Sequence, residues 1–193
     1  SGPPEPLQTG AGSQRLIAEG MVSPDGASPI YRTVADTTGR DIWYRALRGD
    51  TTPKPFEVTP ADETMPRFSP DGRWVTYVSN ESGAPEVFVR PFPGPGGRTQ
   101  ISAGGGTEPV WSPDAKYIAF TDNRVRIRIV DVQAGTIETV DTAGNNLERG
   151  DMGLTWSPDS QWLAYAKAGD NQLRAIQTYH VKTKNRRALT NAF

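Results

Sequence analysis

Short runs in which apolar and polar residues alternate recur along the whole chain, and each is too short to be a helix. Residues 74–78 read Trp-Val-Thr-Tyr-Val, and residues 126–130 alternate arginine with isoleucine before a final valine. Runs of four to eight β-branched and aromatic residues, bounded by Gly, Pro, Asn and Asp, are typical of β-strands. No window of about 11 residues keeps the apolar period of a helix. The pattern predicts an all-β protein.

The tripeptide Ser-Pro-Asp occurs four times, and its successive copies are 46, 43 and 45 residues apart. An aromatic residue precedes three of the copies (Phe68, Trp111 and Trp156), whereas Val22 precedes the first. A four-stranded unit repeated every 40–45 residues is the signature of propeller blades. The sequence therefore predicts a β-propeller built from four four-stranded antiparallel blades.

Each repeat is predicted to supply four strands, which we name a to d from the centre of the propeller outwards. Strand a leads into Ser-Pro-Asp, and strand b is the apolar and aromatic run that follows it. Residues 14–18 are predicted to be a fifth d-like strand, so this segment and the last d strand compete for the outer edge of the fourth blade. The predicted c strands are residues 41–45, 86–90, 126–130 and 175–179, and the predicted d strands are residues 56–59, 99–102, 137–140 and 187–190.

The propeller domain is predicted to span residues 13–193. Residues 1–12 are rich in Pro and Gly and lack an apolar face, so we expect a flexible leader there. Its first two residues, Ser1 and Gly2, match the remnant of a cleaved purification tag. The four repeats lie at about 13–59, 60–102, 103–140 and 141–193.

The Ser-Pro-Asp units predict turns in which the aspartate has a structural role. Proline presets φ for the first central position of a turn, and the carboxylate accepts hydrogen bonds from N–H groups of its own turn. Gly26 and Gly72 complete the first two turns, but Ala115 and Ser160 replace glycine in the others, so we expect those turns to differ in type or to be strained. Turn formation is favoured over metal binding for the four aspartates, which are Asp25, Asp71, Asp114 and Asp159.

The composition narrows the classes of function. The 21 Lys and Arg residues nearly balance the 22 Asp and Glu residues, so there is no strongly basic field for a nucleic acid. The absence of cysteine excludes disulfides, thiolate nucleophiles and Cys-type zinc sites. The single histidine, His180, excludes a multi-His metal site within one chain, and we expect it at a surface or strand edge. No run approaches the ~18 apolar residues of a membrane span.

Sequence motifs for catalysis are missing. The chain has no G-x-S-x-G nucleophile elbow and none of the glycine-rich phosphate-binding patterns. A glycine run at residues 104–106 is explained by loop flexibility between two repeats. We therefore predict a protein that is not an enzyme, has no cofactor and binds neither nucleic acid nor membrane; no cellular compartment follows from the sequence.

Acidic residues precede each Ser-Pro-Asp unit by four or six positions. Because the innermost strands of a propeller enter its central channel from one rim, these carboxylates are candidates for an acidic channel mouth that binds a cation or a basic peptide. Ordinary solvated loop acids are the alternative, and the unequal offsets favour it. The four residues are Glu19, Glu63, Glu108 and Asp151.

Basic and aromatic side chains provide two further candidates. Arg124, Arg126 and Arg128 alternate along one strand, which puts three guanidinium groups on one face for an anion or an acidic peptide, although pairing with nearby acids is favoured. A basic hairpin at residues 182–187 is expected to be a solvated turn. The tryptophans recur in register with the repeat and are expected to pack between blades rather than to stack on a ligand; they are Trp43, Trp74, Trp111, Trp156 and Trp162.

Residues 66–77, Pro-Arg-Phe-Ser-Pro-Asp-Gly-Arg-Trp-Val-Thr-Tyr, resemble the signature segment of the WD-repeat-like, TolB-type propeller family. Within this likeness, residues 40–114 resemble propellers attached to bacterial serine/threonine kinases, and residues 150–193 resemble the propellers of tricorn-type proteases. The change of style along the chain suggests an engineered chimera. Families of this type usually have six or more blades, so four blades imply an excised, recombined or designed piece.

Three functions remain open from the sequence. The first is a non-catalytic scaffold or protein-interaction domain, with a peptide or protein bound at the propeller face. The second is a fragment of a sensor or substrate-gating propeller from a larger kinase or peptidase. The third is a small metal-dependent propeller enzyme that uses the acidic rim. We also expect self-association, most simply as a dimer that forms an eight-bladed ring, because two terminal strands compete for one place.

Overall fold

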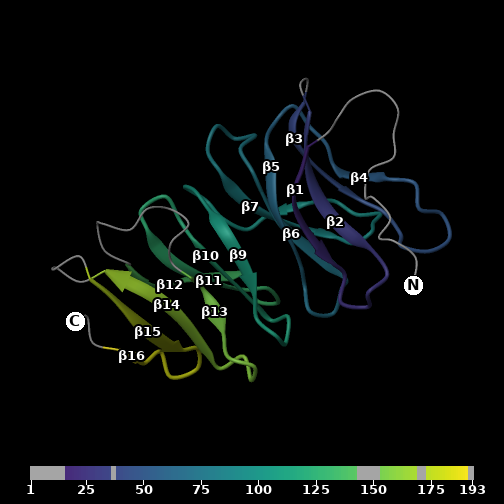
Figure 1. Ribbon diagram of the computed structural model, residues 1–193. Helices are drawn as coiled ribbons and strands as arrows, with labels where there is room; N and C mark the ends of the chain where they lie inside the picture. The colour runs from purple at the N-terminus through teal and green to yellow at the C-terminus, as the bar shows by residue number, and fades with distance from the viewer. Residues whose placement is uncertain (1–15, 36–37, 143–152, 169–172, 191–193) are drawn as a thin grey trace.

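The computed structural model describes residues 16–35, 38–142, 153–168 and 173–190, and these residues form sixteen strands and no helix (Figure 1). Every strand lies in one of four antiparallel sheets, and each sheet takes four strands in chain order. The prediction of an all-β protein with four four-stranded antiparallel blades is confirmed.

The strand bounds follow the repeat. The first blade contains β1 (Leu16–Val22), β2 (Pro29–Ala35), β3 (Gly39–Tyr44) and β4 (Lys54–Glu57). The second contains β5 (Glu63–Phe68), β6 (Trp74–Ser79), β7 (Glu86–Pro91) and β8 (Thr99–Gln100). The third contains β9 (Thr107–Trp111), β10 (Tyr117–Thr121), β11 (Arg126–Asp131) and β12 (Thr136–Thr142). The fourth contains β13 (Thr155–Trp156), β14 (Trp162–Ala168), β15 (Arg174–His180) and β16 (Arg186–Ala188).

The four blades form an open arc rather than a closed ring (Figure 1). The innermost strand of one blade packs on the face of the blade before it: β5 contacts β1, β2 and β3, and β9 contacts β5, β6 and β7. Among the described residues, the first and fourth blades lie at opposite ends of the arc without extensive contact. One face of each end blade therefore has no neighbouring blade in the chain as described.

The predicted fifth d-like strand is wrong for the part that the structure describes. Residues 16–18 begin β1, which pairs with β2 in its own blade, with Leu16 opposite Val34 and Ile17 opposite Thr33. The fourth blade is completed by β16, where Arg187 lies opposite Thr178. A short apolar run has the same pattern in an innermost and an outermost strand, so only the pairing distinguishes them. The competition between two terminal strands, on which the expected dimer was based, is absent from these pairings.

The apolar core lies between the blades. Ile30, Phe68 and Tyr77 are buried between the first and second blades, whereas Leu163 and Tyr179 are buried between the third and fourth. Burial of each such side chain contributes about 1.5–3 kcal/mol relative to leaving it in water. Each blade is therefore stabilised mainly by its neighbours, as is usual in repeat proteins.

The Ser-Pro-Asp turns share one hydrogen-bond pattern. In each, the serine hydroxyl donates to the aspartate two residues later at 2.5–2.7 Å, and the same carboxylate oxygen accepts an N–H from two residues further on. Ala115 and Ser160 have φ values of 59° and 60°, close to the 71° and 70° of Gly26 and Gly72. The four turns therefore share this backbone conformation, and Ala115 and Ser160 adopt it at a steric cost that glycine avoids.

The glycine run at residues 104–106 has a packing role that loop flexibility does not describe. The backbone N–H groups of Gly104 and Gly105 donate to the buried carboxylate of Glu86 at 2.9 and 2.8 Å. A Cβ atom on Gly105 would lie 2.6 Å from the side chain of Asn123. The positive φ values of Gly104 and Gly105, 83° and 99°, and the close approach of Gly105 to Asn123 therefore favour glycine here.

Candidate functional site

The innermost strands carry an irregular backbone position four residues before each serine of the repeat. The pairing of β1 with β2 shifts register between Ile17 and Glu19. At the equivalent positions Met65, Glu108 and Gly153 have φ values of 54°, 57° and 55°. Bulges of this kind are enriched beside functional sites, and the left-handed conformation costs energy in the two residues with a side chain. These irregular positions therefore mark the centre of the arc as a candidate site.

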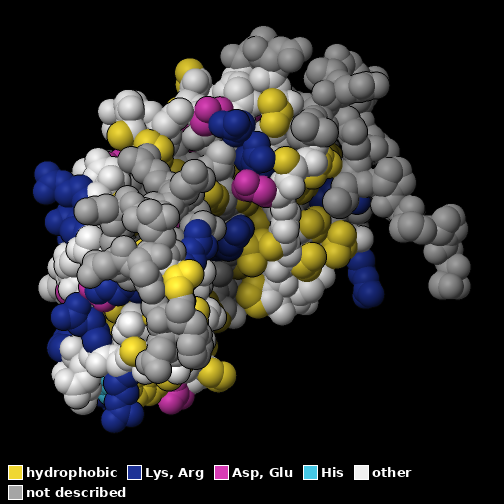
Figure 2. Space-filling model, turned by 60° about the vertical axis from the view of Figure 1, so that its left-hand side comes forward, with side chains coloured by type: hydrophobic (Ala, Val, Ile, Leu, Met, Phe, Trp, Pro, Cys, Tyr) yellow, Lys and Arg dark blue, Asp and Glu magenta, His cyan; other side chains and the backbone are white. Residues whose placement is uncertain are grey.

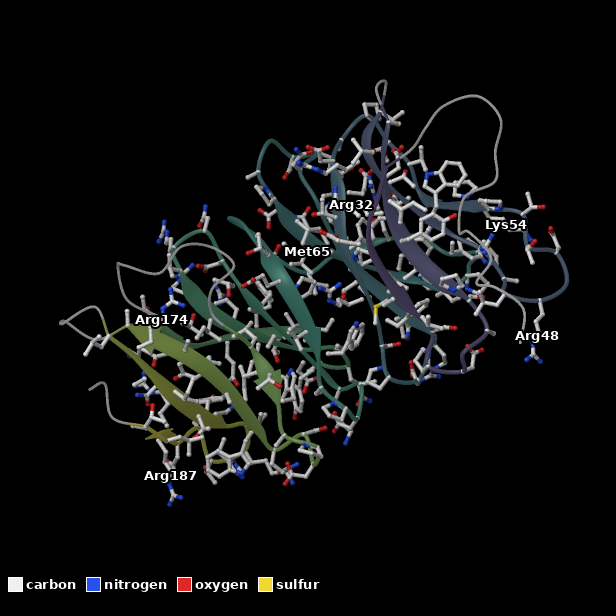
Figure 3. The ribbon with its side chains drawn as sticks, viewed as in Figure 1. Arg32, Arg48, Lys54, Met65, Arg174 and Arg187 are labelled. Carbon is white, nitrogen blue, oxygen red and sulfur yellow. The ribbon has the colours of Figure 1, made fainter. Side chains whose placement is uncertain are left out.

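Glu19 acts as a link between the first two blades. Its carboxylate lies 3.5 Å from the Nε of Arg32 and accepts a hydrogen bond of 2.8 Å from the backbone N–H of Met65 (Figure 3). The positive φ of Met65 belongs to the irregular stretch of β5 that presents this N–H to the first blade. The ion pair with Arg32 stays within the first blade, and the hydrogen bond from Met65 joins that blade to the second.

Glu63 is fully buried and does not lie at an open channel mouth. Thr59 Oγ1 donates to its Oε1 at 2.5 Å, and no group of the described residues forms a hydrogen bond with its Oε2. Burial raises the pKa of Glu63 to about 7; the hydrogen bonds from Thr59 oppose the shift, and the nearby carboxylates of Glu57 and Asp41 add to it. The predicted acidic ring is therefore wrong at Glu63, because an offset of six residues places the side chain in the interface between blades.

Glu108 does line a cleft at the centre of the arc. The cleft has a volume of about 230 Å³ and is formed by the innermost strands, with Met65, Arg67, Pro109 and Leu154 among its walls. Asp151, the fourth predicted acid, lies outside the described residues. Among the described residues, no group of three or more His, Asp or Glu side chains is arranged to hold a metal ion.

The three predicted arginines surround a buried aspartate of their own blade. Arg126 and Arg128 lie 2.7 and 3.3 Å from Asp122 Oδ2, and the backbone N–H of Arg124 donates to the other carboxylate oxygen. Burial alone raises the pKa of Asp122, but hydrogen bonds from Arg126 and from backbone N–H groups outweigh it and lower the pKa below its ordinary value. Arg126 and Arg128 are therefore paired within the blade, and the Arg124 side chain is exposed.

The basic hairpin of the fourth blade reaches across to the third. Lys184 pairs with Glu138 at 2.6 Å, and Arg186 pairs with Asp141 at 3.0 Å. His180 packs edge-on against Trp162, with ring centroids 4.6 Å apart, and its Nδ1 accepts an N–H from Thr183. Figure 2 shows Lys and Arg side chains in separate groups on the visible face rather than in one continuous basic surface.

A second cleft lies at the outer side of the arc, between the second and third blades. Its volume is about 370 Å³, and its walls include Trp74, Ile118, Val132 and Ile137. An adjoining cleft of about 460 Å³ shares Trp74 and Val132 and extends between the Ser-Pro-Asp turns of both blades. Trp74 was predicted from the sequence to pack between blades. Its side chain is partly exposed in the structure, so it also belongs to an open surface.

The family model for the TolB beta propeller domain matches residues 14–193. The chain belongs to this TolB propeller family. A tricorn protease homologue of Streptomyces coelicolor is 32% identical over 122 residues, which cover 58% of this chain and 11% of the homologue.

Two solved structures share the fold of this TolB-type propeller. TolB from Acinetobacter baumannii has a TM-score of 0.65 at 20% identity, over 86% of this chain and 41% of that one. The propeller domain of the trilobed protease from Pyrococcus furiosus has a TM-score of 0.69 at 13% identity, over 92% of this chain and 58% of that domain.

This TolB-type propeller spans only part of its relatives, from 6% to 60% of the length of four curated proteins that it matches. No helix in the described residues is long and apolar enough to cross a membrane.

Proposed function

We propose that this TolB-type propeller is a non-catalytic interaction module, and that its fourth blade receives the first blade of a second copy. The observation that supports the proposal is one position of the repeat. In each blade, the strand b residue nine positions after the serine of Ser-Pro-Asp pairs with an aliphatic residue of strand c. These four equivalent strand c residues are Ile42, Val87, Ile127 and Ile176. The first three are fully buried, whereas Ile176 is 39% exposed.

The face around Ile176 has the character of an interface between blades. Ala164 and Ala166 lie on the same face, opposite Thr178 and Ile176 in the pairing of β14 with β15. Leu189 donates its N–H to the carbonyl of Ile176 and is exposed. In the first two blades this face is covered by the innermost strand of the next blade, and in the third it is buried against Leu163 and Tyr179 of the fourth. An apolar face without a covering blade is a favourable place for association.

The first blade carries the matching uncovered position. The residue before each serine is buried in the second, third and fourth blades as Phe68, Trp111 and Trp156, each of which follows another blade. Val22 holds this position in the first blade and is 50% exposed. If the first blade of one copy covers the fourth blade of another, both positions become buried. Two copies related by a twofold axis can make this contact twice and close the ring.

Light scattering tests the proposal at micromolar protein concentration. The wild-type chain is expected to have twice the mass of 21.0 kDa, and Ile176→Arg is expected to return it to 21.0 kDa. Ile137→Arg is the matched control, because Ile137 is 40% exposed, close to the 39% of Ile176, and belongs to the third blade rather than to either proposed contact face. A wild-type mass of 21.0 kDa would overturn the proposed self-association. An unchanged mass in Ile176→Arg would show that another surface is used.

A second candidate function is supported by the relatives. The chain matches 11% of a tricorn protease homologue and 25% of an uncharacterised Bacillus subtilis peptidase, so it corresponds to one segment of larger proteins. A substrate-gating propeller of a peptidase fits that relationship. The test is peptidase activity of the natural full-length protein with and without these residues: gating predicts altered peptide-length selectivity at an intact active site. The resemblance of residues 40–114 to kinase-attached propellers and the chimeric origin remain predictions from the sequence.

A further inference from the structure

The outer cleft between the second and third blades collects three exposed apolar side chains. Trp74, Val132 and Ile137 are 37%, 38% and 40% exposed and lie around one opening of about 370 Å³. Its floor includes the buried side chains of Val89 and Ile118, which belong to the core between these blades. The cleft therefore continues the apolar core between the second and third blades out to the surface.

The repeat shows what fills the equivalent place between the first and second blades. Phe92, Val132 and Val181 occupy one position, because each backbone N–H donates to the carbonyl four residues after the serine of its own repeat, at 2.8, 2.9 and 3.0 Å. Between the first and second blades, the ring of Phe92 packs edge-on against Phe68 and Tyr44, at centroid distances of 4.7 and 5.0 Å. An aromatic ring thus closes that interface.

The third interface keeps a cleft of about 400 Å³ beside Val181, but charged side chains of the third and fourth blades form much of its lining. Val181 is buried there, in the same cluster as Trp156, whose ring stacks on Tyr117 at 5.9 Å. In the second interface the position holds Val132, and the space beside it stays open. Only the first interface therefore has an aromatic ring at this position, and the opening beside Val132 is lined mainly by apolar side chains.

We propose that this cleft binds an aromatic side chain, of about the size of phenylalanine, presented by a peptide segment of a partner protein. The volume is sufficient, since an apolar cavity of about 150 Å³ already takes up benzene. A bound ring would continue the core formed by Val89 and Ile118. The proposal deepens the proposed interaction function and rests on it, but it concerns a different surface from that of Ile176.

The rim of the cleft suits a peptide. At the adjoining end Arg73 pairs with Asp71 and Lys116 pairs with Asp114, and both cations are largely exposed. Both signs of charge are therefore present beside the apolar opening, and charged groups that flank the aromatic residue can find a partner at modest cost. The apolar ring supplies the affinity, and the rim orients the segment.

N-acetyl-phenylalanine amide is the probe, with N-acetyl-alanine amide as its control. The measurement is the NMR signal of the Trp74 indole N–H, assigned with Trp74→Phe. We expect a saturable shift with millimolar affinity for the phenylalanine compound and none for the alanine compound. Absence of a saturable shift with the phenylalanine compound would overturn the proposal.

Two variants sharpen the test. Val132→Phe introduces the ring found at Phe92, so it should fill the cleft, weaken probe binding about tenfold or more and raise Tm. Val58→Phe is the matched control and should leave binding unchanged. Ile137→Lys changes an exposed wall of the cleft, so it gives a second binding test if Val132→Phe does not fold. Equal binding of the probe by wild type and Ile137→Lys would overturn the proposal. The mass of Ile176→Arg in light scattering tests the self-association separately.

Discussion

Ile127 in β11 and Ile176 in β15 hold the same position in successive blades, yet Ile127 is fully buried and Ile176 is partly exposed. The fourth blade covers Ile127 and buries it in the cluster that contains Leu163 and Tyr179. No further sheet covers Ile176 among the described residues. The same amino acid at the same point of the repeat therefore contributes differently to stability, because its contribution depends on the neighbouring blade.

Alanine substitutions at these two positions are expected to differ in cost. Ile127→Ala should lower the free energy of unfolding by about 2–5 kcal/mol, because it leaves a cavity in the core. Ile176→Ala should cost less than about 1 kcal/mol in dilute solution, where the chain does not associate. Urea denaturation of both variants measures the difference. Equal losses would mean that the fourth-blade face is covered within a single chain.

Glu63 is expected to make stability depend on pH between about 4.5 and about 7. The folded carboxyl has a pKa of about 7, above its ordinary value of 4.5, so it binds its proton more tightly folded than unfolded. Its contribution to stability is therefore present at low pH and is lost as the pH rises to 7. Glu63→Gln should be more stable than wild type at pH 8, by roughly 1–3 kcal/mol, with a smaller difference near pH 4.

The control for Glu63→Gln is Glu81→Gln, which removes the same charge from a partly exposed side chain that pairs with Arg98. Thermal unfolding across pH 4–8 compares the two variants with wild type. If Glu63→Gln were less stable than wild type at pH 8, the buried carboxylate would have a charge partner that the structure does not show.

Trp111 and Trp156 precede the serine in successive repeats but differ in one hydrogen bond. The indole N–H of Trp156 donates to the carbonyl of Val110 at 3.1 Å, whereas the buried indole N–H of Trp111 has no acceptor among the described residues. Trp156→Phe should therefore cost about 1–3 kcal/mol more than Trp111→Phe, because the second change removes an unsatisfied donor. Denaturant titration of the two variants measures this difference in the free energy of unfolding. A larger loss for Trp111→Phe than for Trp156→Phe would contradict the assigned hydrogen bonds.

Ala115 and Gly72 occupy the same position of two Ser-Pro-Asp turns, with φ values of 59° and 70°. Ala115→Gly should relieve left-handed strain and raise stability by up to about 1 kcal/mol, reduced by the greater entropy of the unfolded chain. Gly72→Ala should lower the free energy of unfolding by a similar amount, because alanine is strained at this positive φ. The new Cβ would make only ordinary van der Waals contact with Pro24, so no clash adds to the cost. Ser160 is the less suitable site, because its Oγ accepts the N–H of Asp114. A fall in Tm for Ala115→Gly would show that the entropy term dominates.

Several features were predictable because they depend on residues close together in the chain. The hydroxyl of Ser69 reaches Asp71 two positions away and receives the N–H of Trp74 five positions away, so the Ser-Pro-Asp turn forms from its own residues. Strands b and c follow for the same reason, since hairpins pair segments that are adjacent in sequence. Four copies of this local unit determined the blade number and the all-β class.

Contacts between blades decided everything that the repeat left open. Glu63 is buried, and Val132 lines an open cleft where Phe92 closes one, because of the side chains that a neighbouring blade contributes. The alternation of residues 14–18 did not distinguish an innermost from an outermost strand, and only the pairing of β1 with β2 assigned residues 16–18. The sequence by itself determined the blade, which is held by short-range hydrogen bonds. Only the tertiary structure decided the open arc, the buried carboxyl and the two uncovered surfaces, because burial depends on which blade lies next to each face.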